Sequence, residues 1–144
     1  VVAGIKADLE SLADRYKEAG AKRAIVLDMS VASHCELLNS AVKKLNRYLN
    51  EFVTDNFETP VISNVTAQPY SNKDEAIDLL GKQLVSPVKY KHSIKGYADK
   101  VDMFIEFGNG AVLKGLNRKI CKETGTFNVS DMNSLQETIE KLND

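Results

Sequence analysis

His34 is the residue whose type and position best suit it to chemistry, because imidazole exchanges protons near neutral pH. An apolar run at residues 24–27, typical of a strand covered on both faces, comes shortly before it. The apolar residues after it recur at helical spacing: Leu38, Ala41, Val42, Leu45, Leu49 and Phe52. A single histidine is by default a solvated surface residue. A junction between two rigid elements, however, fixes an accessible side chain, so this placement makes His34 a candidate general base.

The other potential metal ligands do not form a recognisable site. Zinc needs three or four nitrogen, sulfur or oxygen ligands, and His34 with its neighbour Cys35 supplies at most two, which point in different directions. The second histidine, His92, lies in a predicted helix among lysines and is typical of a solvated face. Cys121 is far from Cys35 and no CxxC occurs, so neither a thioredoxin motif nor a zinc knuckle is expected. We therefore expect no metal, and a reducing cytoplasm as the location.

Two further stretches have both a functional and a structural interpretation. Residues 108–110 (GNG) follow a predicted strand and precede a predicted helix, as in turns that set backbone N–H groups against an anion. A tight connection explains both glycines equally well, and the full GxGxxG motif is absent. Lys22 and Arg23 offer a docking patch for an acidic partner, or simply a solvated surface. No Gly-x-Ser-x-Gly occurs, so if His34 is a general base, its nucleophile lies elsewhere.

Length and composition indicate one ordinary globular domain. The 144 residues are 43% hydrophobic and carry a net charge of −1, from 19 basic and 20 acidic side chains. This balance gives no overall basic field, so a nucleic-acid partner is not expected. The apolar runs are far shorter than the roughly 20 residues that span a bilayer, and the start lacks the pattern of a signal peptide.

Periodicity and turn residues predict alternating strands and helices, which is typical of an α/β fold. Strands are predicted at residues 1–3, 24–27, 61–66, 101–107 and 126–129. Helices are predicted at residues 6–18, from just after His34 to about 54, after the capping loop 68–72, from Ser86 and Pro87 onward, at 111–121 and at about 132–142. Gly20 is expected to close the first helix.

Four stretches carry a more specific pattern than any single residue. They are residues 30–38 (SVASHCELL), 60–67 (PVISNVTA), 83–88 (QLVSPV) and 104–116 (FIEFGNGAVLKGL). In order and spacing they resemble the successive signatures of the malonyl-CoA:acyl carrier protein transacylases of bacterial fatty acid synthesis. The resemblance covers essentially the whole sequence and corresponds to roughly the C-terminal half of the family's chain. An opening (VVAG) without methionine, which reads like the middle of a strand, fits this expectation.

The resemblance implies a particular fold and division of labour. Residues 31–144 would form the C-terminal part of an α/β-hydrolase-like acyltransferase domain with parallel strands and flanking helices. Residues 1–30 would form half of a small ferredoxin-like subdomain. The family's serine nucleophile, its oxyanion loop and its malonyl-binding arginine belong to the other half of the chain. That half is therefore an expected partner, and the segment alone is expected to be inactive.

The mechanism that the resemblance implies is transfer of malonyl from coenzyme A to the phosphopantetheine thiol of acyl carrier protein, through a serine ester. His34 matches the family's general base, and the backbone carbonyl at the position of Gln83 would orient its ring. Asn64 is either a supporting polar group near the same place or a turn-forming asparagine. Ser33 would line the substrate pocket, and it leaves both malonyl and methylmalonyl open. Asn109 departs from the proline that is common in the family's corresponding turn.

The partners implied are acyl carrier protein and malonyl-CoA, and no cofactor is needed beyond these substrates. Lys22 and Arg23 are the candidate docking residues for the carrier protein. An interpretation from another class is a non-catalytic acyltransferase-like domain that docks acyl carrier protein or coenzyme A. The motif around His34 favours the enzyme.

Overall fold

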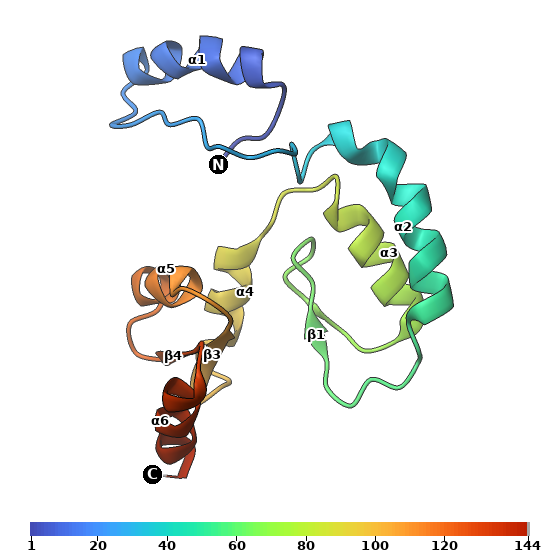
Figure 1. The fold of residues 1–144 in the computed structure, drawn as a ribbon, viewed down its shortest axis with the longest axis vertical. Coiled ribbons are helices and arrows are strands. Elements are labelled where there is room, and N and C mark those ends of the chain that lie inside the picture. Colours follow the sequence, from blue (N-terminus) through green and yellow to red (C-terminus); the bar gives the residue numbers. More distant parts are fainter. Residues whose placement is uncertain (144) are drawn as a thin grey trace. The chain divides into compact units, whose positions relative to one another are not determined.

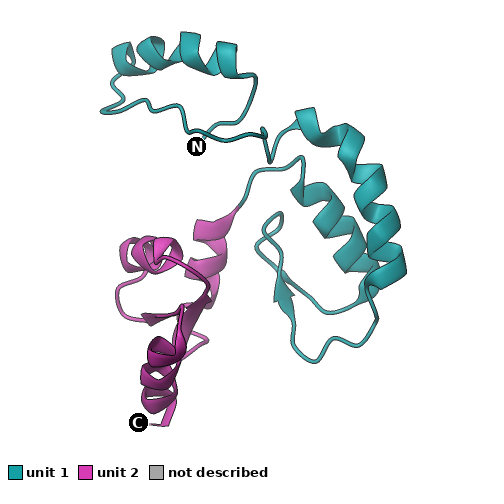
Figure 2. Ribbon diagram, in the orientation of Figure 1, with its two compact units in different colours: residues 1–88 teal, residues 89–144 magenta. Residues whose placement is uncertain are grey.

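The computed structural model describes residues 1–143 and divides into two compact units, residues 1–88 and 89 onward (Figure 2). The helices are α1 (Lys6–Glu18), the 3-10 helix η1 (Glu36–Leu38), α2 (Asn39–Phe52), α3 (Lys73–Gln83), α4 (Tyr90–Tyr97), α5 (Val112–Ile120) and α6 (Met132–Asn143) (Figure 1). The strands are β1 (Val61–Ile62), β2 (Pro69–Tyr70), β3 (Met103–Phe107) and β4 (Gly125–Val129). Helices combined with a parallel strand pair confirm the predicted α/β class. The division at residue 30 stays a prediction.

Helix α1 has the predicted bounds because its C-terminus carries a local stop signal. Gly20 adopts a φ of +94°, which a residue with a side chain rarely does. Its N–H donates to the Lys17 carbonyl, and the Ala21 N–H donates to the Tyr16 carbonyl, both at 2.9 Å. This pair of bonds is the Schellman motif, so carbonyls that the helix leaves unpaired are satisfied.

The strands predicted at residues 1–3 and 24–27 are wrong, since neither segment is a strand in the structure. A strand needs a ladder of backbone hydrogen bonds with a neighbour. The Leu27 carbonyl instead accepts from the Met29 N–H two residues later, at 2.9 Å. Ile25 and Leu27 are 71% and 62% exposed, so the expected burial on both faces is wrong too. An apolar run without a pairing partner does not form a strand.

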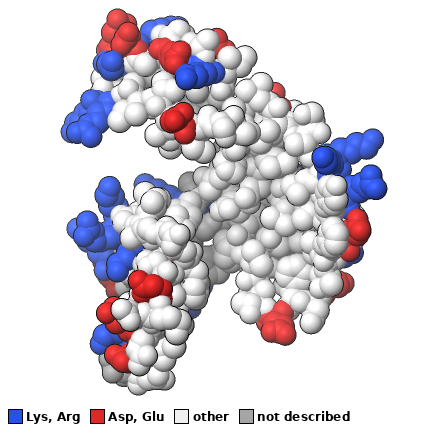
Figure 3. Space-filling model, viewed as in Figure 1, with Lys and Arg blue, Asp and Glu red and all other residues white. Residues whose placement is uncertain are grey.

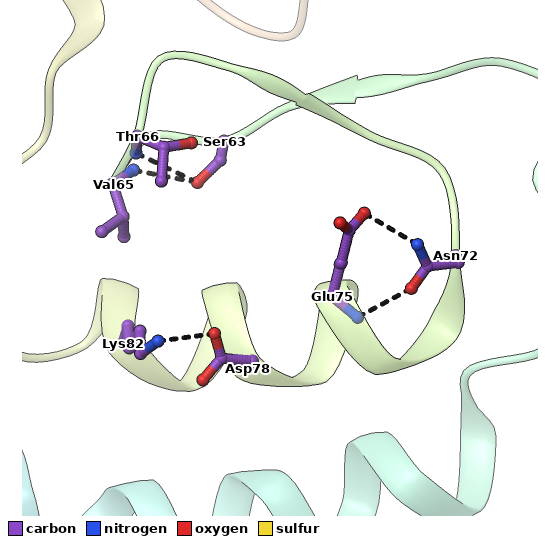
Figure 4. A network of polar contacts seen from close by, with 7 residues as sticks. All are labelled: Ser63, Val65, Thr66, Asn72, Glu75, Asp78 and Lys82. Atoms are coloured by element: carbon purple, nitrogen blue, oxygen red, sulfur yellow. Dashed lines mark hydrogen bonds and ion pairs between the residues drawn. The ribbon is translucent and has the colours of Figure 1, made fainter.

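Helices α2 and α3 pack side by side in the first unit (Figure 1). The contact depends on Gly81, which is buried in α3. A Cβ at this position would collide with the side-chain amide of Asn46 in α2, so the glycine leaves room for that side chain between the two helices. The N-terminus of α3 is capped by Asn72, as predicted. Its Oδ1 accepts from the Glu75 N–H at 2.9 Å and its Nδ2 donates to Glu75 Oε2 at 2.8 Å (Figure 4).

The strand predicted at residues 61–66 ends after two residues, because Ser63 starts a turn. Its buried Oγ accepts from the N–H groups of Val65, at 3.1 Å, and Thr66, at 3.4 Å (Figure 4). A serine side chain that bonds nearby backbone in this way competes with the strand ladder. The chain then reverses into β2, which was predicted as loop and which pairs antiparallel with β1.

The helix predicted to start at Ser86 and Pro87 is wrong at its beginning, since α4 starts at Tyr90. The first helical bonds go to the Lys89 carbonyl, from the N–H groups of His92 at 2.9 Å and Ser93 at 3.1 Å. Proline has no N–H and disfavours helical backbone in the residue before it. The dipeptide therefore belongs to the connection between α3 and α4.

In the second unit β3 and β4 pair in parallel, with Met103 opposite Gly125 and Phe107 opposite Val129. Both strands and the helices α5 and α6 lie within two residues of their predicted bounds. A buried asparagine, Asn117, links three elements: its Oδ1 accepts from the Tyr90 hydroxyl at 2.7 Å, and its Nδ2 donates to Thr126 Oγ1 at 3.2 Å. Burial raises the pKa of the Tyr90 hydroxyl, so it stays protonated as the donor of this bond.

Candidate functional site

His34 is exposed and is held by the C-terminal end of α3 at two points. Its backbone N–H donates to the Leu84 carbonyl at 2.9 Å. Its ring Nδ1 lies 2.8 Å from the Gln83 carbonyl oxygen. Because a carbonyl can only accept, Nδ1 carries the proton in this contact. In the neutral ring, Nε2 is then left with a free lone pair, as a general base requires.

The elements explain why these two carbonyls are available. Helix α3 ends at Gln83, and the last carbonyls of an α-helix have no partner within the helix. His34 is 49 residues away in sequence from Gln83, so this is a tertiary contact. His34 also has a φ of +63°, which is uncommon for a residue other than glycine and costs free energy. The two bonds to α3 hold the backbone in this unfavourable conformation.

A second polar contact brings Asn64 to the same helix end. Asn64 lies in the turn between β1 and β2, two residues beyond the end of β1. Its Nδ2 donates to the Gln83 side-chain Oε1 at 3.3 Å, and both side chains are half-buried. Gln83 thus contacts His34 through its backbone and Asn64 through its side chain. The structure places these three predicted residues in one cluster.

Ser33 and His34 line a hollow of about 650 Å³ that is formed within residues 1–34. Most of its other lining residues are apolar, among them Leu9, Ile25 and Leu27, and Arg23 also lines it. Ser33 is half-buried, and its N–H donates to the Val31 carbonyl at 3.0 Å. Lys22 and Arg23 are both exposed, as a docking role requires.

The remaining candidates have structural explanations. Residues 108–110 form the connection from β3 to α5, and Gly108 and Gly110 have φ values of +127° and +88°. The Glu106 carboxylate accepts from the N–H groups of Leu113, at 3.0 Å, and Lys114, at 2.9 Å, in the first turn of α5. His92 is exposed on α4. Within residues 1–143, no group of three or more His, Cys, Asp or Glu side chains could hold a metal ion.

The sequence pattern did not identify Leu84 as part of the site. Its contribution is a backbone carbonyl, which has no residue type to recognise. The only signal is its place just beyond a helix C-terminus.

Among the helices of the described chain, none is long and apolar enough to cross a membrane.

No family model matches this sequence. It is 38% identical over 143 residues to the malonyl CoA-acyl carrier protein transacylase of Bacillus subtilis. This match covers 99% of this chain and 45% of that protein. The crystal structure of malonyl-CoA:acyl carrier protein transacylase from Helicobacter pylori superposes with a TM-score of 0.92 and 42% identity, over 98% of this chain and 45% of that chain. The chain thus spans about half the length of these proteins.

A second similar structure contains a partner. It is a malonyl-transacylase in complex with a type II polyketide synthase acyl-carrier protein, with a TM-score of 0.88 and 32% identity. The match covers 96% of this chain and 45% of that chain.

Proposed function

This chain is homologous, over nearly its whole length, to about half of the malonyl CoA-acyl carrier protein transacylases, and on that basis we propose that it is the base-bearing part of such an enzyme. The proposed reaction is ping-pong acyl transfer. A serine takes malonyl from coenzyme A as an ester and passes it to the phosphopantetheine thiol of acyl carrier protein. The substrates carry the reacting groups, so no metal or further cofactor is proposed. The proposed location is the cytoplasm.

The observation that carries the base role of His34 is the 2.8 Å contact between its Nδ1 and the Gln83 carbonyl oxygen. A serine hydroxyl is a weak nucleophile until a neighbouring base accepts its proton. The carbonyl holds the ring proton on Nδ1, which leaves the Nε2 lone pair free to accept the serine proton. During acylation Nε2 accepts the serine proton as the oxygen attacks the thioester carbon, and it then donates that proton to the leaving thiolate. The Gln83 carbonyl stabilises the imidazolium formed between these two steps.

The nucleophile is proposed to lie outside these 144 residues. No Gly-x-Ser-x-Gly occurs in the sequence, and the relatives are about twice as long as the chain. The chain alone should therefore not transfer malonyl groups. Malonyl transfer by purified residues 1–144 that depends on His34 would overturn the assignment.

The test of the base is single-turnover acylation by malonyl-CoA in a full-length protein that contains this chain. His34→Ala should lower the acylation rate by about 10² to 10⁴, the range usual for loss of a general base. His92→Ala is the matched control, because His92 is exposed on α4 and has no proposed role. Binding of the coenzyme A thioester should change little in either variant. Near-normal acylation by His34→Ala would end the general-base assignment. No acylation by the unmodified full-length protein would instead favour a domain that docks carrier protein or coenzyme A without catalysis.

Acyl carrier protein is the proposed second substrate, since a similar structure is a complex with one. Two exposed cationic surfaces suit a partner with acidic groups. One is the predicted pair Lys22 and Arg23. The other is on α5, where Lys and Arg side chains gather in Figure 3, and its exposed members are Lys114, Arg118 and Lys119.

Charge-reversal variants test which of these two surfaces docks acyl carrier protein. Lys22→Glu with Arg23→Glu should slow transfer to acyl carrier protein more than it slows loading from malonyl-CoA, because docking of a protein partner depends on opposite charges over its surface. Loading is measured in parallel, because coenzyme A is also anionic and Arg23 lines the hollow beside Ser33. The matched double variant is Arg118→Glu with Lys119→Glu. The comparison is made at low and at physiological salt, because attraction between exposed charges is screened by ions. Slower transfer in the α5 variant alone would move the docking surface away from Lys22 and Arg23.

A further inference from the structure

The bond between the Asn64 and Gln83 side chains joins the β1–β2 turn to the residue whose carbonyl contacts His34. Asn64 Nδ2 donates to Gln83 Oε1 at 3.3 Å, and the Gln83 carbonyl oxygen lies 2.8 Å from His34 Nδ1. Gln83 is also the last residue of α3. Helix ends fray readily because their final carbonyls lack partners within the helix. An additional link at this residue therefore limits the movement of the carbonyl that faces the imidazole.

The turn that carries Asn64 is itself well anchored. The buried Ser63 Oγ accepts from the N–H groups of Val65 and Thr66 (Figure 4). The strands β1 and β2, which come before and after this turn, pair with each other. The Ser63 N–H donates to the Gln68 carbonyl at 2.9 Å, and the Ala67 N–H donates to the Ser63 carbonyl at 2.8 Å. A side chain on such a turn is a firmer support than one on an open loop.

Packing alone does not fix the Gln83 side chain. Asn64 and Gln83 both line a hollow of about 220 Å³ in the first unit, together with residues of β1 and α3. A long side chain beside open space keeps alternative rotamers, and fixing one of them costs conformational entropy. The hydrogen bond from Asn64 favours the rotamer that the structure shows.

We propose that Asn64 is a positioning residue for His34. Its Nδ2–H group holds the Gln83 side chain, and through it the Gln83 carbonyl that keeps the imidazole proton on Nδ1. This role rests on the proposed function of His34 as the general base, because it matters to catalysis only if Nε2 must be free. Asn64 itself contacts neither substrate nor the reacting atoms in this proposal.

The tautomer of His34 measures this role directly and without substrate. Long-range ¹H–¹⁵N correlation spectra of the imidazole rings distinguish a proton on Nδ1 from a proton on Nε2. The spectra are recorded about two pH units above the ordinary histidine pKa of about 6.5, where the ring is neutral. The spectra are recorded on the full-length protein that contains this chain, the His34 signal is assigned from its loss in His34→Ala, and exposed His92 serves as an internal reference. In the unmodified chain we expect His34 to carry its proton mainly on Nδ1.

Three variants and one control test the link. Asn64→Ala should lower the ratio of the Nδ1–H to the Nε2–H form of His34 by up to roughly tenfold, since the free energy of about one hydrogen bond is the upper limit for an effect transmitted through the Gln83 side chain. Gln83→Met, which keeps the length and the backbone carbonyl but has no amide, should give the same change without altering the turn. The double variant should show no further change, because both substitutions remove one interaction. The control Gln68→Ala removes an exposed amide from the same turn and should leave the ratio unchanged.

Two outcomes would overturn the proposal. One is an unchanged His34 tautomer ratio in folded Asn64→Ala or in Gln83→Met. The other is a double variant in which the two single effects add, since independent effects exclude a shared bond. A different result, near-normal acylation by His34→Ala, would contradict the proposed function. The tautomer measurement uses no substrate, so it stays interpretable in that case.

Discussion

His34 and Glu106 differ in what their functional atoms contact. The His34 ring has a backbone carbonyl on Nδ1, whereas both oxygens of the Glu106 carboxylate accept N–H groups at the start of α5. A carboxylate so placed stabilises the positive end of the helix dipole. The structure therefore gives Glu106 a local role within its own unit.

This difference leads to a prediction for two substitutions in the full-length protein. Gln83→Ala should reduce malonyl loading by roughly tenfold or less, on the scale where about 1.4 kcal/mol is one decade, because alanine keeps the backbone carbonyl. Glu106→Gln should load at a near-normal rate, because the amide oxygen still accepts one of the two N–H bonds. Single-turnover acylation by malonyl-CoA measures both. The alternative to the Gln83 carbonyl is a catalytic carboxylate that orients His34, and a collapse of loading in folded Glu106→Gln would favour that alternative.

The site could be predicted only in part at this scale. The position of His34 before a helix follows from apolar spacing, but its contact with Gln83 does not follow from any local pattern. The two residues are 49 positions apart, and the atom that Gln83 contributes is common to every residue. Only the resemblance to a family indicated that carbonyl. The Asn64 contact depends on the turn at Ser63, which the pattern had assigned to a strand.

At the scale of elements, the helices follow the sequence more closely than the strands do. Gly20 and Asn72 act within a few residues of the helix ends that they define, so local spacing reveals them. A strand depends on a partner that can lie anywhere in the chain. The apolar segment 24–27 has no strand partner among the described residues, whereas β3 has β4 and forms near its predicted position.

The close packing of α2 and α3 gives a stability prediction with a matched control. Gly81→Ala should destabilise the first unit by about 1 to 3 kcal/mol, because the new Cβ collides with the Asn46 amide and either that half-buried side chain or the helices must shift. Gly115→Ala in α5 is the control. Nothing lies within 4 Å of a Cβ at that position, so alanine should stabilise the helix by about 0.5 to 1 kcal/mol.

Urea unfolding followed by far-UV circular dichroism measures both changes. The two substitutions are chemically identical, so opposite signs report the difference in surroundings. If Gly81→Ala were as stable as the unmodified chain, the approach of α2 and α3 would not depend on a glycine.

At the scale of the whole molecule, the first 31 residues expose many large apolar side chains. Those exposed are Val1, Val2, Ile5, Tyr16, Ile25, Val26, Leu27, Met29 and Val31. Several of them line the hollow of about 650 Å³. Contiguous exposed apolar surface of this kind is unusual for a monomeric soluble protein and promotes association.

We therefore predict that residues 1–144 self-associate when purified alone, because association removes this apolar surface from water. Sedimentation velocity over a range of protein concentrations should show species larger than the 15.9 kDa monomer, increasing with concentration. Ile25→Lys with Leu27→Lys should reduce the association, since both positions are exposed and charges there oppose burial. The matched control is Lys43→Ala with Lys44→Ala on α2, which changes exposed charge outside residues 1–31 and should leave the association unchanged. If residues 1–144 stayed monomeric at high concentration and unfolded in one cooperative transition, they would behave as an independent folding unit. That result would contradict the expectation that they are half of a larger fold.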